Sequence, residues 1–508
     1  MKLFGKTTEQ IDTWTQSHAL TRMLTSHVWL AFFYGIFLFL YEIVILREVV
    51  PVVHPLLIAW AGALIFYDIV VRKYWKEMPY WKVLAVFAVI CLVSAFMNRE
   101  GGIAGNIKSF IMVMLPLGAF YPICLMEKKE NRERAFLRAL LGGAIVVFIA
   151  SFIALVLFLV RFRQEFTFRG VAGVIGYRYY LPKDPTSGLL LYGIYKDTNH
   201  AAIYALVFAV YSLFGMIMCR RGEFGKKWQN KWGGVFFACN FVVQMLYFPL
   251  ANSRGGWLSL IFSMAVVLFL FFARRKLSKG QPVVRCVAGL LLAASCTALV
   301  CGVMLVGRTA MSHASVEISE NVGTEISGAI KLPGKKPPLK DDSFVKKDSF
   351  EGAGRIDIWK QTLQLVACRP LWGIGPNHTY FAEKYDLASY TIGAGKAVHN
   401  SYLHLMLNDG IPAFAVMLLF CLLCCIQVGR ACWKRGKKLP VPFYMVTVMA
   451  ALVACGAMFL SCIFTDTTAM YFLLLSSMGY LMAVCREVNV KGKKVPIEDN
   501  SLKQEGEE

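Results

Sequence analysis

Long apolar windows limit what this sequence can fold into more than any other feature. Windows of roughly 17 to 25 apolar residues, the length that spans a bilayer, recur along the 508 residues. Apolar residues make up 57% of the chain and the mean hydropathy is +0.53, more than a soluble fold can bury. The sequence therefore predicts an all-α polytopic membrane protein with about twelve transmembrane helices, near 28–46, 52–71, 83–97, 109–126, 139–160, 201–219, 233–251, 257–273, 286–306, 402–427, 442–464 and 469–485.

Lys and Arg are concentrated in the segments on one side of these apolar windows. The segments on one side hold 32 of them, in 1–27, 72–82, 128–138, 220–231, 274–285, 430–438 and 486–508, whereas the four short loops opposite hold only Arg47, Arg99, Lys108 and Arg254. Because cytoplasmic loops are enriched in Lys and Arg, both termini are expected in the cytoplasm. The net charge of +22 is then mostly topological, and it indicates contact with anionic membrane lipids rather than with nucleic acid.

Two outer segments, 161–198 and 307–398, are long and basic. Long loops are exempt from the topological bias, so their cations, Arg169 and Arg178 among them, are free to serve a substrate. The chain is thus expected to divide into a cytoplasmic segment 1–27, transmembrane helices one to nine in 28–306, an extracytoplasmic loop 307–398 between helices nine and ten, helices ten to twelve in 399–485, and a cytoplasmic tail 486–508.

The larger loop changes composition along its length. Residues 320–350 are rich in Lys, Gly, Pro and Ser, which is typical of a linker. Apolar side chains then recur at helical spacing at Ile356, Trp359, Leu363 and Val366, which predicts an amphipathic helix near 355–368 at the outer membrane surface.

Three short polar segments interrupt the apolar pattern on the same predicted side: Asn252–Gly256, Gly354–Trp359 and Val398–Tyr402. Arg254 and Arg355 each stand where a helix begins, and a cation there opposes the helix dipole unless an anion binds. Ser253 is a candidate helix cap or substrate contact. A membrane-interface arginine beside a glycine turn is the alternative reading of Arg254.

His399 is predicted to open the tenth transmembrane helix. The helix dipole and neighbouring cations favour a neutral imidazole there, which a general base requires. Asn400 beside it and Asn199 at the sixth helix are each expected to cap a helix or contact the substrate. His200 and His404 lie on or near the same side, so the base is not assigned uniquely.

An ordered set of these motifs covers roughly residues 190–430: Thr198–Asn199 at a helix start, Ser253–Gly255, Arg355 with Trp359, the Pro370 to Gly375 turn, and His399–Leu403 with Gly410. The set resembles the O-antigen ligase and O-antigen polymerase superfamily of bacterial membrane glycosyltransferases.

The resemblance implies metal-independent transfer of a glycan from a polyprenyl (undecaprenyl) diphosphate carrier to an acceptor hydroxyl at the outer face of the bacterial cytoplasmic membrane. It implies that Arg254 and Arg355 hold the diphosphate and that His399 deprotonates the acceptor. The implied partners are a lipid-linked oligosaccharide donor, a glycan or glycolipid acceptor and membrane lipids, with no cofactor. Ligase and polymerase both fit, and a transporter or flippase of a lipid-linked saccharide is the alternative.

Overall fold

The computed structural model describes residues 2–3, 6–168, 171–179, 189–277, 279–322, 355–384, 398–461, 463–464 and 466–490. Its α-helices are α1 (Thr8–Ser17), α2 (Ala19–Leu24), α3 (His27–Tyr41), α4 (His54–Tyr67), α5 (Trp81–Met97), α6 (Ile103–Ala119), α7 (Lys129–Leu159), α8 (Thr198–Arg220), α9 (Lys227–Ala251), α10 (Arg254–Phe271), α11 (Pro282–Val322), α12 (Arg355–Cys368), α13 (His378–Lys384), α14 (Ser401–Arg435), α15 (Val441–Gly456) and α16 (Ala469–Val490). The strands are β1 (Lys2–Leu3), β2 (Lys6–Thr7), β3 (Arg163–Phe168), β4 (Val171–Tyr179) and β5 (Leu189–Gly193).

Eight helical segments of the described residues are long and apolar enough to cross a membrane: Leu46–Arg72, Lys129–Leu159, Thr198–Arg220, Lys227–Ala251, Arg254–Lys276, Pro282–Ser315, Ser401–Lys438 and Ala469–Val488. The remaining predicted windows coincide with shorter apolar helices, His27–Tyr41, Trp81–Met97, Ile103–Ala119 and Val441–Gly456. The prediction of an all-α polytopic membrane protein is confirmed. The count of twelve spanning helices stays a prediction.

Two helices run further than the apolar windows. The sequence ends the ninth membrane helix at residue 306, whereas α11 continues to Val322. The sequence also predicts a loop at 128–138, whereas α7 begins at Lys129. Hydropathy marks only the apolar part of a helix, while the helical hydrogen bonding continues through polar residues with adequate helix propensity.

The segment 161–198, predicted as an outer loop, is not only loop, because part of it forms a three-stranded antiparallel sheet in the order β3-β4-β5. Arg163 pairs with Gly176 at one end of the β3-β4 ladder, and Tyr177 pairs with Leu191 in β5. The β-branched and aromatic residues of this segment favour strands. The all-α expectation therefore holds for the membrane bundle and misses this small sheet.

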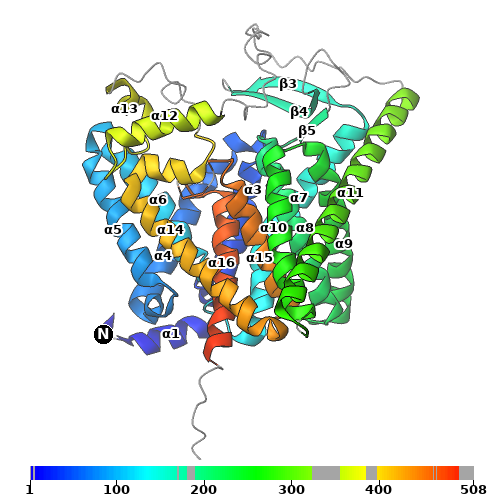
Figure 1. The fold of residues 1–508 in the computed structure, drawn as a ribbon. Helices are drawn as coiled ribbons and strands as arrows, with labels where there is room; N and C mark the ends of the chain where they lie inside the picture. The colour runs from blue at the N-terminus through cyan, green and yellow to red at the C-terminus, as the bar shows by residue number, and fades with distance from the viewer. Residues whose placement is uncertain are drawn as a thin grey trace, which may run out of the picture.

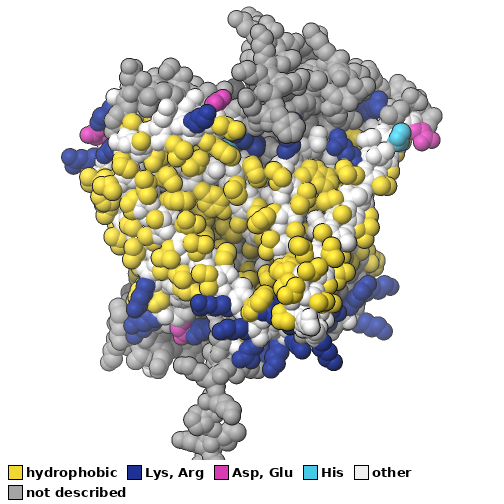
Figure 2. Space-filling view, viewed as in Figure 1, with side chains coloured by type: hydrophobic (Ala, Val, Ile, Leu, Met, Phe, Trp, Pro, Cys, Tyr) yellow, Lys and Arg dark blue, Asp and Glu magenta, His cyan; other side chains and the backbone are white. Residues whose placement is uncertain are grey.

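The helices form one bundle with different structures at its two ends (Figure 1). The sheet, α12 and α13 lie at one end, called here the α12 face, and α1 lies at the other, called the α1 face. Between them the surface shows a broad belt of apolar side chains, with Lys and Arg gathered along its α1 edge (Figure 2). Large apolar side chains such as Leu291 and Leu299 of α11 are mostly exposed, as in a helix that faces lipid.

Candidate functional site

The beginning of α10 carries Arg254 in a tightly defined turn. Ser253 caps the helix, because its hydroxyl oxygen accepts a hydrogen bond from the Gly256 N–H at 3.2 Å. The same hydroxyl donates to the side-chain oxygen of Asn199 at 2.9 Å, and Asn252 before it adopts a left-handed backbone with φ +52°. Arg254 is the first residue of α10 and is exposed. The predicted cap is confirmed, and it ties α10 to the start of α8.

His399 lies just outside its helix. The N-cap of α14 is Asn400, whose side-chain oxygen accepts from the N–H groups of Tyr402 at 3.0 Å and Leu403 at 3.1 Å. His399 precedes this cap with a left-handed backbone, φ +52°. The prediction that His399 opens the helix is therefore corrected by two residues. A non-glycine residue in this conformation costs about 1 kcal/mol or more and is often found at functional sites.

Residues 457–460, which follow α15, contact the beginnings of both α10 and α14. The Ser401 N–H donates to the Ala457 carbonyl at 2.8 Å, and the Ser401 hydroxyl donates to the Leu460 carbonyl at 2.5 Å. A Cβ added at Gly255 would lie only 3.2 Å from the Cβ of Phe459. Gly255 therefore lets α10 approach the same segment that anchors α14, which brings the Arg254 and His399 segments together.

The helix that carries Arg355 packs on the segment before His399. The indole N–H of Trp359 donates to the Val398 carbonyl at 3.2 Å. A small buried core joins α12 to α13 and α14, with Ile358, Leu365, Val366, Ile374, Phe381, Val398 and Leu407. Trp359 belongs to the predicted amphipathic helix near 355–368, and its hydrogen bond fixes α12 beside Val398, the residue before His399.

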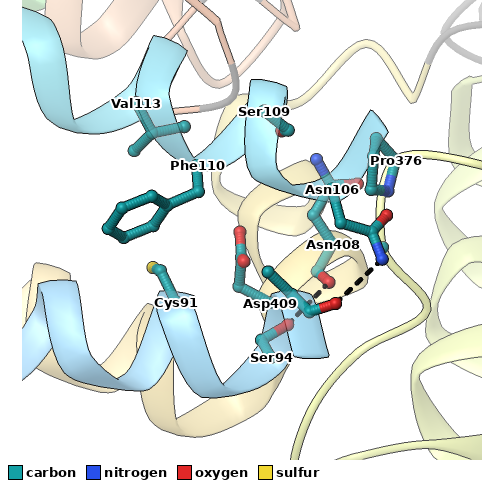
Figure 3. A pocket seen from close by; sticks show the side chains of 11 residues that line it. Cys91, Ser94, Asn106, Ser109, Phe110, Val113, Pro376, Asn408 and Asp409 are labelled. Carbon is teal, nitrogen blue, oxygen red and sulfur yellow. Dashed lines mark hydrogen bonds between the residues drawn. The ribbon is translucent and has the colours of Figure 1, made fainter. Parts of the chain in front are cut away.

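A turn after α12 clamps α14 at a break in its hydrogen bonding. The Ile374 N–H donates to the Leu407 carbonyl at 2.8 Å, and the Gly375 N–H donates to the Asn408 carbonyl at 2.9 Å. Gly410 interrupts the helix with φ +87°. A small cavity of about 10 Å³ lies beside the break, with the Asp409 carboxyl directed into it (Figure 3). This cavity belongs to the clamp, since Gly375, Asn408 and Asp409 line it.

Arg254, Arg355 and His399 lie close enough to act on one another through their charges. Burial lowers the pKa of Arg355, and the nearby Arg254 guanidinium lowers it further, while Asp197 opposes the shift. Burial likewise lowers the pKa of His399, assisted by the Arg355 guanidinium. Because the ordinary histidine pKa is about 6.5, His399 is a neutral imidazole at pH 7. Two guanidinium groups and a neutral imidazole therefore lie in one region.

Sequence reasoning missed the acidic side chains that support this region. Asp197 caps α8 by accepting from the Asn199 N–H at 2.7 Å, so the N-cap is Asp197 rather than Asn199. Glu42 is buried and lies 3.2 Å from the Lys196 ammonium and 3.7 Å from Nδ1 of His200. A carboxyl inside the predicted window 28–46 was the available signal, since such groups are rare in membrane helices and usually have a role.

Glu42 is held in its charged form. Burial by itself would raise the pKa of Glu42, but the neighbouring His200 imidazole and Lys196 ammonium outweigh burial and lower it to about 2. The unfolded value is about 4.3. Charged Glu42 therefore stabilises the fold above the unfolded pKa, and this contribution is lost as the pH falls through the folded pKa.

We expect Glu42→Gln to lower the stability by roughly 2 kcal/mol near pH 7, since it leaves the partly buried Lys196 without its counter-charge. Thermal unfolding in detergent measures the effect, with Glu48→Gln as the matched control at the same end of the bundle. The gap in melting temperature between wild type and Glu42→Gln should shrink as the pH is lowered towards 3. A gap that stays constant from pH 7 to pH 3 would contradict the ion pair.

The structure describes only some of the other residues that the sequence predicted to contact the substrate. Asn199 lies at the site through its bond to Ser253, and the Asn400 oxygen is occupied by capping. Arg178 belongs to β4, where it pairs with Leu190 of β5. The side chain of Arg178 and the whole of Arg169 lie outside the described residues.

Comparison with known families gives one finding for this region. Residues 239–418 match the model of a family described as O-antigen ligase, and the matched segment contains Arg254, Arg355 and His399. A comparison with curated proteins gave no match. Asn199 and Glu42 lie before the matched segment, so that part of the region rests on the structure alone. Over residues 239–418 the chain is therefore similar to the O-antigen ligase family.

Proposed function

We propose that this protein is a membrane glycosyltransferase that moves a glycan from a polyprenyl diphosphate carrier, of the undecaprenyl type, to an acceptor hydroxyl. The acceptor is a second glycan or a glycolipid, so both ligase and polymerase activities fit. One observation carries the proposal: the two arginines and the histidine of the matched segment converge at one end of a membrane bundle.

The chemistry follows from the charges at this place. The acceptor oxygen attacks the anomeric carbon of the donor sugar, the bond from that carbon to the phosphate oxygen breaks, and the diphosphate leaves with the bonding electrons. Arg254 and Arg355 would bind the departing oxygens, where fixed guanidinium groups stabilise charge as it develops. His399 would take the acceptor proton, for which its neutral imidazole is suited.

The location also suits a substrate that arrives through the lipid. The three residues lie outside or at the very start of their helices, so a carrier whose chain remains in the bilayer could present its diphosphate to them. The Lys and Arg gathered at the α1 edge support a cytoplasmic position for that edge, because cytoplasmic loops are enriched in these residues. We therefore propose that the α12 face, with the site, is turned outward in the cytoplasmic membrane and that both termini are cytoplasmic.

Purified protein in detergent micelles provides the test of the proposed reaction. We expect that protein mixed with undecaprenyl-diphosphate-linked glycan and acceptor forms a covalent product and releases undecaprenyl diphosphate. Mass spectrometry of both products measures the transfer, with a reaction lacking acceptor as control. No membrane separates two compartments in detergent. Movement of the donor across liposomes without any covalent product would support a transporter or flippase and contradict the proposal.

A further inference from the structure

A dense group of cations lies at the α1 face, away from the proposed active site. Residues 272–285 and 430–438 contain ten Lys and Arg side chains and no Asp or Glu. The π-helical turn η6 (Phe272–Lys276), which ends α10, packs against the beginning of α11 and against η9 (Gly436–Lys438), which follows α14. Two stretches far apart in the sequence thus form one basic surface, named here the η6 cluster.

The η6 cluster is built around a close approach to a glycine. A Cβ added at Gly436 would lie 3.0 Å from the Cβ of Arg274 and 3.2 Å from the Tyr444 hydroxyl. The Arg274 guanidinium lies over the ring of Trp433, and Arg275 lies near enough to Tyr444 to influence its hydroxyl. Both guanidinium groups are therefore directed to the same corner between α10, α14 and α15.

Two nitrogen atoms of these arginines are buried without an acceptor among the described residues: Nε of Arg274 and Nη1 of Arg275. Neither side chain forms an ion pair with a described carboxylate, and Arg285 of α11 adds a like charge close to Arg274. A buried charged donor without an acceptor costs free energy. Repulsion between neighbouring cations adds to that cost, whereas one bound anion would relieve both.

We propose that the η6 cluster binds the phosphate of an anionic phospholipid headgroup in the cytoplasmic leaflet. A phosphodiester supplies negative oxygens that match the N–H groups of two arginines. The cluster lies where α10 and α14 leave the apolar belt, and the 52% exposed Trp433 beside it is a residue type enriched at the membrane interface. A lipid therefore fits the surroundings better than free phosphate, which has no apolar part to place there. This site is independent of the proposed transfer reaction.

Native mass spectrometry of the detergent-purified protein, mixed with phosphatidylglycerol or phosphatidylcholine, tests this site. We expect wild type to bind phosphatidylglycerol in preference to phosphatidylcholine. The double variant Arg274→Gln/Arg275→Gln should bind phosphatidylglycerol about tenfold more weakly, because it loses two charged hydrogen-bond donors. The control Arg220→Gln/Lys227→Gln makes the same charge change at exposed positions of this face and should bind as wild type does.

A parallel thermal scan with each lipid and with inorganic phosphate separates the remaining outcomes. We expect phosphatidylglycerol to raise the melting temperature of wild type and of the control variant, but not that of Arg274→Gln/Arg275→Gln. Equal phosphatidylglycerol binding by all three proteins would overturn the site. An equal rise from inorganic phosphate alone would overturn the lipid as its ligand. If the double variant does not fold, Arg274→Lys, which retains the charge without the planar donor set, must bind more weakly than wild type.

Discussion

Replacing His399 with alanine should reduce kcat by about 10²- to 10⁴-fold, the usual contribution of a positioned general base, while KM for the donor changes little. In the proposed reaction the imidazole removes the acceptor proton, whereas the two arginines bind the donor diphosphate in the ground state as well. Product formation at saturating donor and acceptor measures the effect. His313→Ala, at an exposed histidine of α11, is the matched control and should retain wild-type activity.

The pH profile separates a base from a residue that only supports the fold. Because burial and Arg355 lower the pKa of His399, the acidic limb of kcat should lie below pH 6.5 in wild type and be absent in His399→Ala. Arg355→Gln removes a repulsive positive charge, so the limb of its residual activity should move to higher pH. Wild-type pH dependence in His399→Ala would assign the base elsewhere, and His200, whose charge acts on His399, is one alternative.

Removing either guanidinium should have an effect of similar size with a different kinetic pattern. We expect Arg254→Ala and Arg355→Ala each to lower kcat/KM by about 10²- to 10³-fold, as for loss of one preorganised donor to developing charge. Each should also weaken binding of the undecaprenyl diphosphate product. Lysine at either position should restore only part of the activity, because an ammonium cannot make the bidentate contact of a guanidinium.

Arg99→Ala provides the comparison, since Arg99 is an exposed cation in a predicted outer loop and its loss leaves the proposed diphosphate contacts intact. Normal insertion and melting behaviour of Arg254→Ala and Arg355→Ala must accompany the loss of activity. Full activity in either variant would remove that arginine from the proposed diphosphate contacts.

Much of the membrane bundle could be predicted from the sequence because apolar windows report directly on helices in lipid. The local signals at the site were also readable, since Ser253 and Asn400 are favoured helix caps and Gly410 with Pro412 disfavours an unbroken helix. The full lengths of α7 and α11 could not be predicted from apolar windows, because the polar ends of these helices carry no hydropathy signal.

What the sequence could not provide was the set of contacts between distant segments. Glu42 meets Lys196 and His200 across about 150 residues of chain, and Trp359 meets Val398 through a backbone carbonyl. Neither pairing follows from spacing or composition. The left-handed backbone of His399 likewise could not be assigned from the sequence, because histidine adopts a positive φ more often than most residues but still does so uncommonly.

The most direct measurement is an experimental structure of the protein with a non-transferable polyprenyl diphosphate sugar bound. The proposed site predicts that oxygens of one diphosphate accept hydrogen bonds from both Arg254 and Arg355, with the anomeric carbon turned towards the side on which His399 lies. A diphosphate bound at another place on the bundle, or one that contacts neither guanidinium, would contradict it.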